Sequence, residues 1–380
     1  MEEKRTTQRR TFESGSLEIS LLGLGCMRFP QTADKKIDME KAGEIVDYAY
    51  AHGVNYFDTA YVYNGGESEE VMGKLLKKYG RSTYYLADKM PMWQIEKAED
   101  LETIFETSLR RLQTDYIDFY LIHALDAEKF EKSLRFGVYD FICKKKKEGK
   151  VRHIGFSFHD SPSVLRRILD AYPVEFVQIQ LNYLDWELQD AKTQYEILQE
   201  KGIPCIVMEP VRGGSLADLG ETGNAILKGI HPERSIASWA IRYAASYPNV
   251  LTVLSGMSSL EQVRDNVQTL SHTEPFSAEE SQALALALDA YRKKDTVPCT
   301  GCRYCMECPS GVDIPLMFRL YNHYAFHQDQ KAFLEGYDKA GDGQAANCVA
   351  CGICTQHCPQ SIAIPEMMER IRELVKKLRK

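Results

Sequence analysis

The chain has 380 residues, of which 47 are basic and 54 acidic, and its net charge is −7. This length exceeds the usual limit of one compact core, so it favours two domains or one large barrel with an appendage. Neither sign of charge dominates a long stretch, which argues against nucleic-acid binding.

The N-terminus is charged and lacks the apolar region of a secretory signal, and no stretch approaches 18 apolar residues. We therefore expect a cytoplasmic protein without membrane association. Eleven cysteines are present, and eight of them fall in the last 82 residues. That distribution indicates a metal-binding module on a reduced enzyme rather than a disulfide scaffold.

Eight short apolar runs of β type alternate with amphipathic helical segments. The runs cover residues 20–27, 54–59, 83–89, 116–123, 152–158, 176–181, 204–209 and 250–256. This alternation predicts an α/β protein whose eight parallel strands close a (β/α) TIM barrel. The first helix is expected within residues 38–53, with one apolar stripe formed by Ala42, Ile45, Val46 and Ala49.

The composition changes near residue 295, where a cysteine-rich segment punctuated by proline begins. We place a domain boundary there, between a barrel at 1–294 and a smaller domain at 295–380. Pro315 suits the first turn of a helix, so this smaller domain is expected to be mostly helical. The last segment, residues 364–380, carries an apolar stripe that we expect to pack against the barrel.

Polar residues end three consecutive strands of the predicted barrel, where catalytic groups of such barrels lie. Asp58 ends the second run, Lys89 the third and His123 the fourth, and Tyr63 follows Asp58 on the next loop. Taken singly, these residues also fit a helix cap, a solvated lysine and a packed histidine. Together they predict one cluster on one rim of the barrel.

Three segments, FDTAYVYNGGESEEVMGKLL, YLADK and FYLIH, resemble the aldo-keto reductases. The resemblance extends over about residues 15–290 and includes EGKVRHIGFS, QIQLNYL and VLSGMSSLEQVRDN. It implies an NAD(P)H-dependent oxidoreductase that reduces a carbonyl, or oxidises an alcohol, by hydride transfer. It also implies a catalytic tetrad of Asp58, Tyr63, Lys89 and His123.

Elementary chemistry is consistent with these roles. A free tyrosine has a pKa of about 10, and the ammonium of Lys89 would favour the phenolate of Tyr63. Tyr63 would then serve as general acid, Asp58 would hold Lys89, and His123 would orient the carbonyl oxygen. Loops that carry Arg28, Phe29, Trp93 and Trp186 are expected to roof the substrate pocket.

The chain has no Gly-x-Gly-x-x-Gly fingerprint that opens a strand-helix unit, which argues against a Rossmann site. The resemblance implies that the barrel itself holds the dinucleotide. It assigns Ser157 and Gln180 to the nicotinamide amide, and Asp265 and Asn266 to the adenine. The loop MEPVRGG would run along the pyrophosphate.

The dinucleotide site departs from the family pattern at several positions. Met208 stands where the family usually has a stacking tyrosine, and Gly256 and Gln262 stand where basic residues often grip the ribose 2′-phosphate. Arg212 is a candidate for the missing positive charge. The resemblance favours NADPH as cofactor and leaves NADH open.

The cysteines form two groups of four with short, regular spacing. The second group has the spacing CxxCxxCxxxCP of a bacterial ferredoxin, and the first group is one residue shorter in its last gap. The groups are Cys299, Cys302, Cys305 and Cys308, and Cys348, Cys351, Cys354 and Cys358. This spacing predicts two 4Fe-4S clusters, with tetrahedral zinc sites as the alternative. In two-cluster ferredoxins the fourth cysteine ligates the other cluster, so we expect Cys358 with the first group and Cys308 with the second.

Two functions follow from these predictions. The first is a reductase acting on a small carbonyl or alcohol, whose ferredoxin-like module exchanges electrons with a ferredoxin or another electron-transfer protein. Hydride transfer moves two electrons and a cluster carries one, and no flavin-binding motif is visible to convert between them. The alternative is therefore a redox-sensing or regulatory subunit whose clusters are structural or serve a partner protein.

Overall fold

The computed structural model describes residues 6–12, 16–306 and 308–380. Eight parallel strands close a barrel in the order β10-β3-β4-β5-β6-β7-β8-β9, which confirms the predicted architecture. The strands are β3 (Leu22–Gly25), β4 (Tyr56–Asp58), β5 (Tyr85–Pro91), β6 (Ile117–Leu125), β7 (Val151–Phe158), β8 (Phe176–Gln180), β9 (Cys205–Met208) and β10 (Val250–Ser255).

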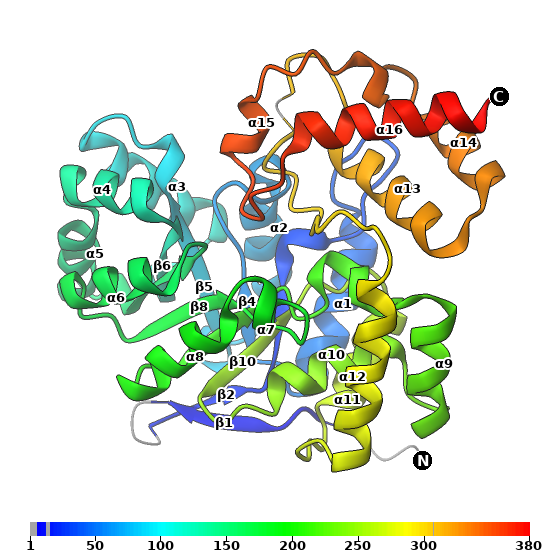
Figure 1. Cartoon of the computed structure of the whole chain (residues 1–380). Helices are drawn as coiled ribbons and strands as arrows, with labels where there is room; N and C mark the ends of the chain where they lie inside the picture. Colours follow the sequence, from blue (N-terminus) through cyan, green and yellow to red (C-terminus); the bar gives the residue numbers. More distant parts are fainter. Residues whose placement is uncertain (1–5, 13–15, 307) are drawn as a thin grey trace. The chain divides into compact units, whose positions relative to one another are not determined.

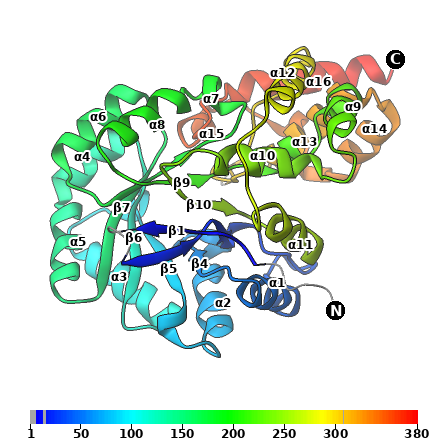
Figure 2. The same cartoon turned by 90° about the horizontal axis from the view of Figure 1, so that it is seen from below.

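Helices surround the strands (Figures 1 and 2). They are α1 (Met39–Ala51), α2 (Glu67–Leu76), α3 (Glu99–Leu112), α4 (Ala127–Phe136), α5 (Val138–Lys147), α6 (Pro162–Ala171), α7 (Asp185–Leu188), α8 (Ala191–Glu200), α10 (Ile236–Ala245) and α11 (Leu260–Thr269). In α1 the Asp38 side chain caps the first turn by accepting from the backbone N–H of Lys41. The four residues of the predicted stripe are buried, so the periodicity located this helix correctly.

An N-terminal hairpin that the sequence patterns did not reveal fills one end of the barrel. It pairs β1 (Arg9–Phe12) antiparallel with β2 (Leu17–Ser20). Phe12 and Ile19 are buried in one cluster with residues of the barrel interior such as Tyr56 and Phe119. The hairpin therefore extends the core at the end of the barrel where the parallel strands begin.

The chain divides into two compact units. The first comprises Met1–Pro210 and Ser238–Pro275, and the second comprises Val211–Ala237 and Phe276–Lys380. The second unit contains α9 (Gly220–Ile230), α12 (Ala278–Arg292), α13 (Ile314–His327), α14 (Gln330–Lys339), α15 (Ile353–Gln356) and α16 (Ile364–Leu378). The C-terminal segment is helical, as predicted, and the segment after β9 belongs to the same unit.

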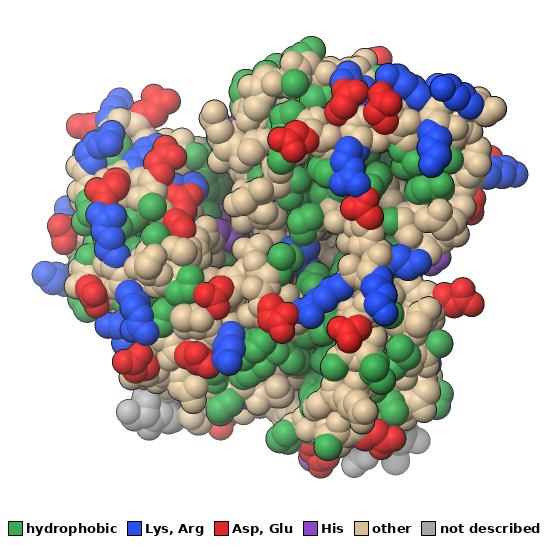
Figure 3. All heavy atoms as spheres, viewed as in Figure 1, with side chains coloured by type: hydrophobic (Ala, Val, Ile, Leu, Met, Phe, Trp, Pro, Cys, Tyr) green, Lys and Arg blue, Asp and Glu red, His purple; other side chains and the backbone are tan. Residues whose placement is uncertain are grey.

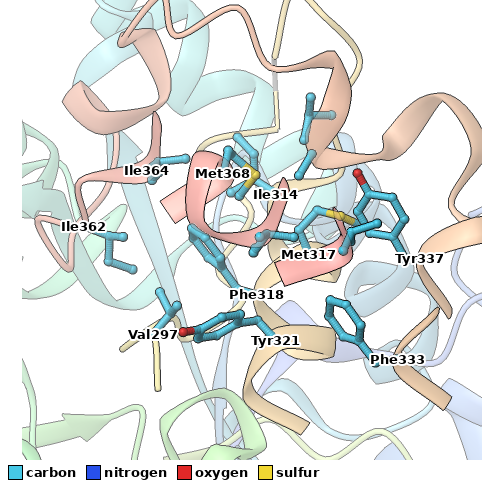
Figure 4. Close-up of a cluster of buried hydrophobic side chains, with 14 residues drawn as sticks. Val297, Ile314, Met317, Phe318, Tyr321, Phe333, Tyr337, Ile362, Ile364 and Met368 are labelled. Atoms are coloured by element: carbon cyan, nitrogen blue, oxygen red, sulfur yellow. The ribbon is translucent and has the colours of Figure 1, made fainter. Parts of the chain in front are cut away.

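The second unit has a hydrophobic core of its own. Side chains of α13, α14 and α16 gather in one cluster, among them Met317, Phe333 and Met368 (Figure 4). The expectation that the apolar stripe of α16 packs against the barrel is therefore wrong. Ile371 and Val375 of that stripe are buried in this cluster, because the module is large enough to cover its own last helix.

None of the described helices combines the length and the apolar character needed to cross a membrane. On the face shown in Figure 3, acidic and basic side chains are interspersed.

Candidate active site and cysteine centre

The four predicted catalytic residues come from neighbouring elements of the barrel. Asp58 is the last residue of β4, Lys89 lies in β5 and His123 lies in β6. These strands are hydrogen-bonded neighbours, with Asp58 opposite Ala87 and His123 opposite Pro91. Tyr63 begins the short turn Tyr63–Gly66 that leads into α2. The alternation of strands and helices thus brings residues 31 and 34 positions apart to one end of the barrel.

Lys89 and Asp58 form a buried ion pair. The Lys89 Nζ atom donates to Asp58 Oδ1 at 2.6 Å and to the carbonyl oxygen of Thr59 at 2.7 Å. The lysine is 0% exposed and the aspartate 3% exposed. Burial raises the pKa of Asp58, and the charge of Lys89 opposes that rise. The pair holds the lysine ammonium 4.8 Å from the centre of the Tyr63 ring.

Tyr63 differs from the expectation in its acidity. Its pKa is raised well above the ordinary value, first by burial and then by the negative charges of Asp58 and Glu209. The expected net lowering of this pKa is wrong, because burial has the largest effect on the phenol. Tyr63 is therefore a protonated phenol at neutral pH.

His123 lies beside the phenol. The ring centres of Tyr63 and His123 are 5.9 Å apart in an edge-to-face arrangement. Burial, and then the charge of Lys89, lowers the pKa of His123 well below its usual value. The imidazole is therefore neutral and can donate one hydrogen bond without carrying a charge.

Of the two tryptophans expected to roof the pocket, Trp93 lies beside the tetrad and Trp186 does not. Trp93 is 37% exposed, and its ring centre lies 4.9 Å from that of His123. Trp186 instead stacks on Tyr247 at 4.6 Å, in a separate aromatic group. Phe29 is buried. Trp93 is thus the aromatic side chain best placed to meet a substrate at the tetrad.

Glu209 is a residue of this site that the sequence analysis missed. Arg28 Nη2 lies 3.0 Å from Glu209 Oε1, and the charges of both act on the pKa of Tyr63. Glu209 follows the last residue of β9. A charged residue directly after an apolar run was the available signal, the same one that located Asp58.

The expected dinucleotide contacts in the first unit come from the carboxyl ends of β7 to β10 and from α11. Several already have protein partners. Ser157 Oγ accepts from the Ala124 N–H at 2.7 Å, and Gln180 Nε2 donates to Asp185 Oδ2 at 2.7 Å. Asn266 is buried and donates to the Ser255 hydroxyl.

The remaining candidates are arranged as follows. Gln262 and Asp265 lie in α11, where the Gln262 side chain accepts from the N–H of Ser258 at 2.8 Å. Met208 ends β9, and Gly256 follows β10 directly. Arg212 belongs to the second unit, where its buried guanidinium donates to Gln360.

The eight cysteines form two groups, both within the second unit. One hollow is lined by Cys308, Cys348, Cys351 and Cys354. The Cys305 thiol has its pKa raised by burial and then by the neighbouring sulfurs of Cys302, Cys299 and Cys358. Cys308 thus lines a hollow with three cysteines of the second group, and Cys358 lies near Cys305 of the first group.

The two cysteine groups share one backbone feature, an N–H directed at the sulfur of their first cysteine. The N–H of Gly301 points to Cys299 Sγ at 3.3 Å, and the N–H of Ala350 points to Cys348 Sγ at 3.4 Å. Gly301 and Gly352, expected at tight turns, have φ of 65° and 79°. Backbone donors aimed at sulfur stabilise thiolate ligands, which fits an iron-sulfur cluster.

No group of three or more His, Cys, Asp or Glu side chains within the described residues converges on a single metal ion. In a cubane each thiolate binds a different iron, so its four sulfurs stand further apart than the ligands of one ion.

Comparison with known proteins gives a family match for each part of the chain. The aldo/keto reductase family model matches residues 21–288, and the 4Fe-4S dicluster domain matches residues 298–363. The uncharacterized oxidoreductase YqkF of Bacillus subtilis is 27% identical over 309 residues, covering 73% of this chain and 95% of that protein. The probable aldo-keto reductase 1 of Glycine max is 31% identical over 219 residues, which span 54% of this chain and 60% of that protein.

A solved structure agrees with these matches. The holo form of aldo-keto reductase AKR11C1 from Bacillus halodurans superposes with a TM-score of 0.61 at 28% identity, covering 74% of this chain and 96% of that one. The chain is therefore an oxidoreductase that belongs to the aldo/keto reductase family and carries a 4Fe-4S dicluster domain.

Proposed function

We propose that this protein reduces a small carbonyl compound, or oxidises the corresponding alcohol, with Tyr63 as proton donor and acceptor. The observation that carries this proposal is the buried cluster of Asp58, Tyr63, Lys89 and His123 on adjacent elements. A protonated phenol suits reduction, because the alkoxide formed from a carbonyl is a far stronger base than a phenolate. Neutral His123 orients the carbonyl oxygen, and Asp58 holds Lys89 beneath the phenol ring.

When bound, a nicotinamide dinucleotide supplies or accepts the hydride, and the family resemblance favours NADPH over NADH. The residues proposed to hold it are Ser157, Gln180, Met208, Gly256, Gln262, Asp265 and Asn266, all in the first unit. Ser157 and Gln180 lie at the ends of β7 and β8. Their present hydrogen bonds within the barrel fix the orientation of both side chains before a ligand arrives.

We also infer that the domain at 295–380 holds two 4Fe-4S clusters. Cys299, Cys302 and Cys305 with Cys358 would hold one, and Cys348, Cys351 and Cys354 with Cys308 the other. The grouping of these sulfurs and the backbone donors aimed at two of them support this assignment. Bound clusters would exchange single electrons with a ferredoxin or another electron-transfer protein of the cytoplasm.

The barrel's part of the proposal is tested by Tyr63→Phe. We expect the rate of NADPH-dependent reduction, measured on a panel of aldehydes and ketones, to fall by about 10²- to 10⁴-fold, the usual contribution of a general acid. Tyr61→Phe is the matched control, since the Tyr61 ring packs on Arg111, 4.6 Å from its guanidinium carbon, outside the tetrad. Full activity of Tyr63→Phe would refute the assigned role.

The cluster part is tested by iron and acid-labile sulfide analysis after anaerobic purification. Two cubanes predict about eight iron atoms per chain, whereas zinc without iron would overturn the assignment. NADPH is then added anaerobically while cluster absorbance is followed. Bleaching without substrate would support exchange between hydride and clusters, and unchanged absorbance would favour structural clusters in a sensing or regulatory protein.

A further inference from the structure

The segment after β9 is pressed against the cysteine-rich segment within the second unit. Gly213 has φ of 65°, and a Cβ atom placed on it would lie 1.8 Å from the carbonyl oxygen of Thr300. No side chain fits in that space, so glycine is required for the approach. Thr300 is buried and directly follows Cys299. The segment therefore touches the backbone of the first cysteine group.

Arg212 directly precedes Gly213, and its side chain also contacts the cysteine-rich segment. The side chain is among the largest that are fully buried, with 1% exposed. Arg212 Nη2 donates to Gln360 Oε1 at 2.9 Å. Gln360 stands two residues after Cys358, so their Cα atoms are at most about 7 Å apart. Arg212 is thus bonded to a residue two positions after Cys358, and its neighbour Gly213 lies against the residue that follows Cys299.

Arg212 also has an unusual backbone. Its φ is 52°, in the left-handed region that non-glycine residues rarely adopt. Such a conformation persists only where the surrounding structure imposes it. Here the neighbouring Gly213 lies against Thr300, and the Arg212 side chain is bonded to Gln360. Because the side chain is 1% exposed, it presents almost no surface to a ribose phosphate, the role expected from the sequence.

The guanidinium of an arginine carries a positive charge. A cubane with four thiolates carries a net negative charge, which becomes more negative on reduction. We propose that Arg212 raises the reduction potential of the cluster held by Cys299, Cys302, Cys305 and Cys358. This inference rests on the proposed function of those cysteines. Arg212 acts through the surroundings of the cluster and is a positioning residue, not a catalytic one.

The test is a dithionite titration of the anaerobic holoenzyme, followed by electron paramagnetic resonance. In Arg212→Gln, one of the two clusters should show a reduced-to-oxidised ratio about tenfold lower at a fixed potential, a shift of about 59 mV for one electron. Gln360→Glu adds a negative charge to the same contact and should shift the same cluster in the same direction. Arg212→Lys keeps the charge and should keep most of the wild-type potential.

Arg319→Gln is the matched control, because it removes one arginine charge from the exposed face of α13. Iron and sulfide are measured on every variant. Normal iron with unchanged potentials in both Arg212→Gln and Gln360→Glu would overturn this inference and leave the clusters in place. An equal shift in Arg319→Gln would also overturn it, whereas wild-type protein without iron would overturn the proposed function itself. If Arg212→Gln loses iron, the potentials of Gln360→Glu decide the question: a shifted cluster supports the inference, and unchanged potentials overturn it.

Discussion

The ion pair of Lys89 and Asp58 allows a quantitative prediction. Lys89→Met leaves the Asp58 carboxylate buried without its cation, and its second oxygen, Oδ2, already has no hydrogen-bond partner among the described residues. Removing one partner of a buried pair usually costs about 3–5 kcal/mol. At about 2–4 °C per kcal/mol for a domain of this size, the melting temperature should fall by roughly 6–20 °C.

The pH dependence of this variant follows from the pKa of Asp58. That pKa is already raised by burial in the wild type, and it rises further without the lysine. A carboxyl with a raised folded-state pKa loses stability as the pH rises above its unfolded-state value. The melting temperature of Lys89→Met, followed by circular dichroism, should therefore recover as the pH falls from 7 toward 5.

The control for this experiment is Lys78→Met. Lys78 Nζ also lies 2.6 Å from a carboxylate oxygen, that of Asp47, but both side chains are about half exposed, at 49% and 46%. An exposed pair contributes roughly 0–1 kcal/mol, so this variant should melt near the wild type. Equal losses in Lys89→Met and Lys78→Met would show that burial does not decide the strength of these pairs.

Three further substitutions test other parts of the site and fold. Glu209→Gln removes a charge that raises the pKa of Tyr63, so the high-pH decline of carbonyl reduction should move to lower pH in a pH–rate profile. A decline at the wild-type pH would count against the effect of Glu209 on Tyr63. Asp88→Asn should raise the free energy of urea unfolding at pH 7 by about 1–3 kcal/mol, because burial and a neighbouring glutamate raise the pKa of Asp88. That gain should vanish toward pH 4. Gly213→Ala should speed the loss of cluster absorbance in air, since its Cβ would overlap the Thr300 carbonyl.

The elements that sequence reasoning located share one property. Each barrel strand is an apolar run that is buried on both sides, and each tetrad residue of β4 to β6 ends or lies near the end of such a run. Burial and residue type are visible in the sequence as local patterns. Asp58, Lys89 and His123 could therefore be grouped before any coordinates were known.

The features that sequence reasoning missed depend on contacts between distant segments. Arg212 and Gln360 are 148 positions apart, and no local pattern indicates that they meet. The pKa of Tyr63 depends first on burial and then on the negative charges of Asp58 and Glu209, so residue types alone gave the wrong direction. The position of α16 depended on whether the module could cover its own last helix, which composition does not reveal.

The chain itself connects the two kinds of chemistry. Glu209, whose charge raises the pKa of Tyr63, stands three positions before Arg212, which is bonded to Gln360 beside the second cysteine group in the sequence. A hydride step moves two electrons at the barrel, and a cubane changes its charge by one. No flavin-binding motif joins these steps, so direct electron exchange is the harder hypothesis. The anaerobic NADPH titration distinguishes these cases, because bleaching without substrate requires electron exchange and unchanged absorbance favours structural or regulatory clusters.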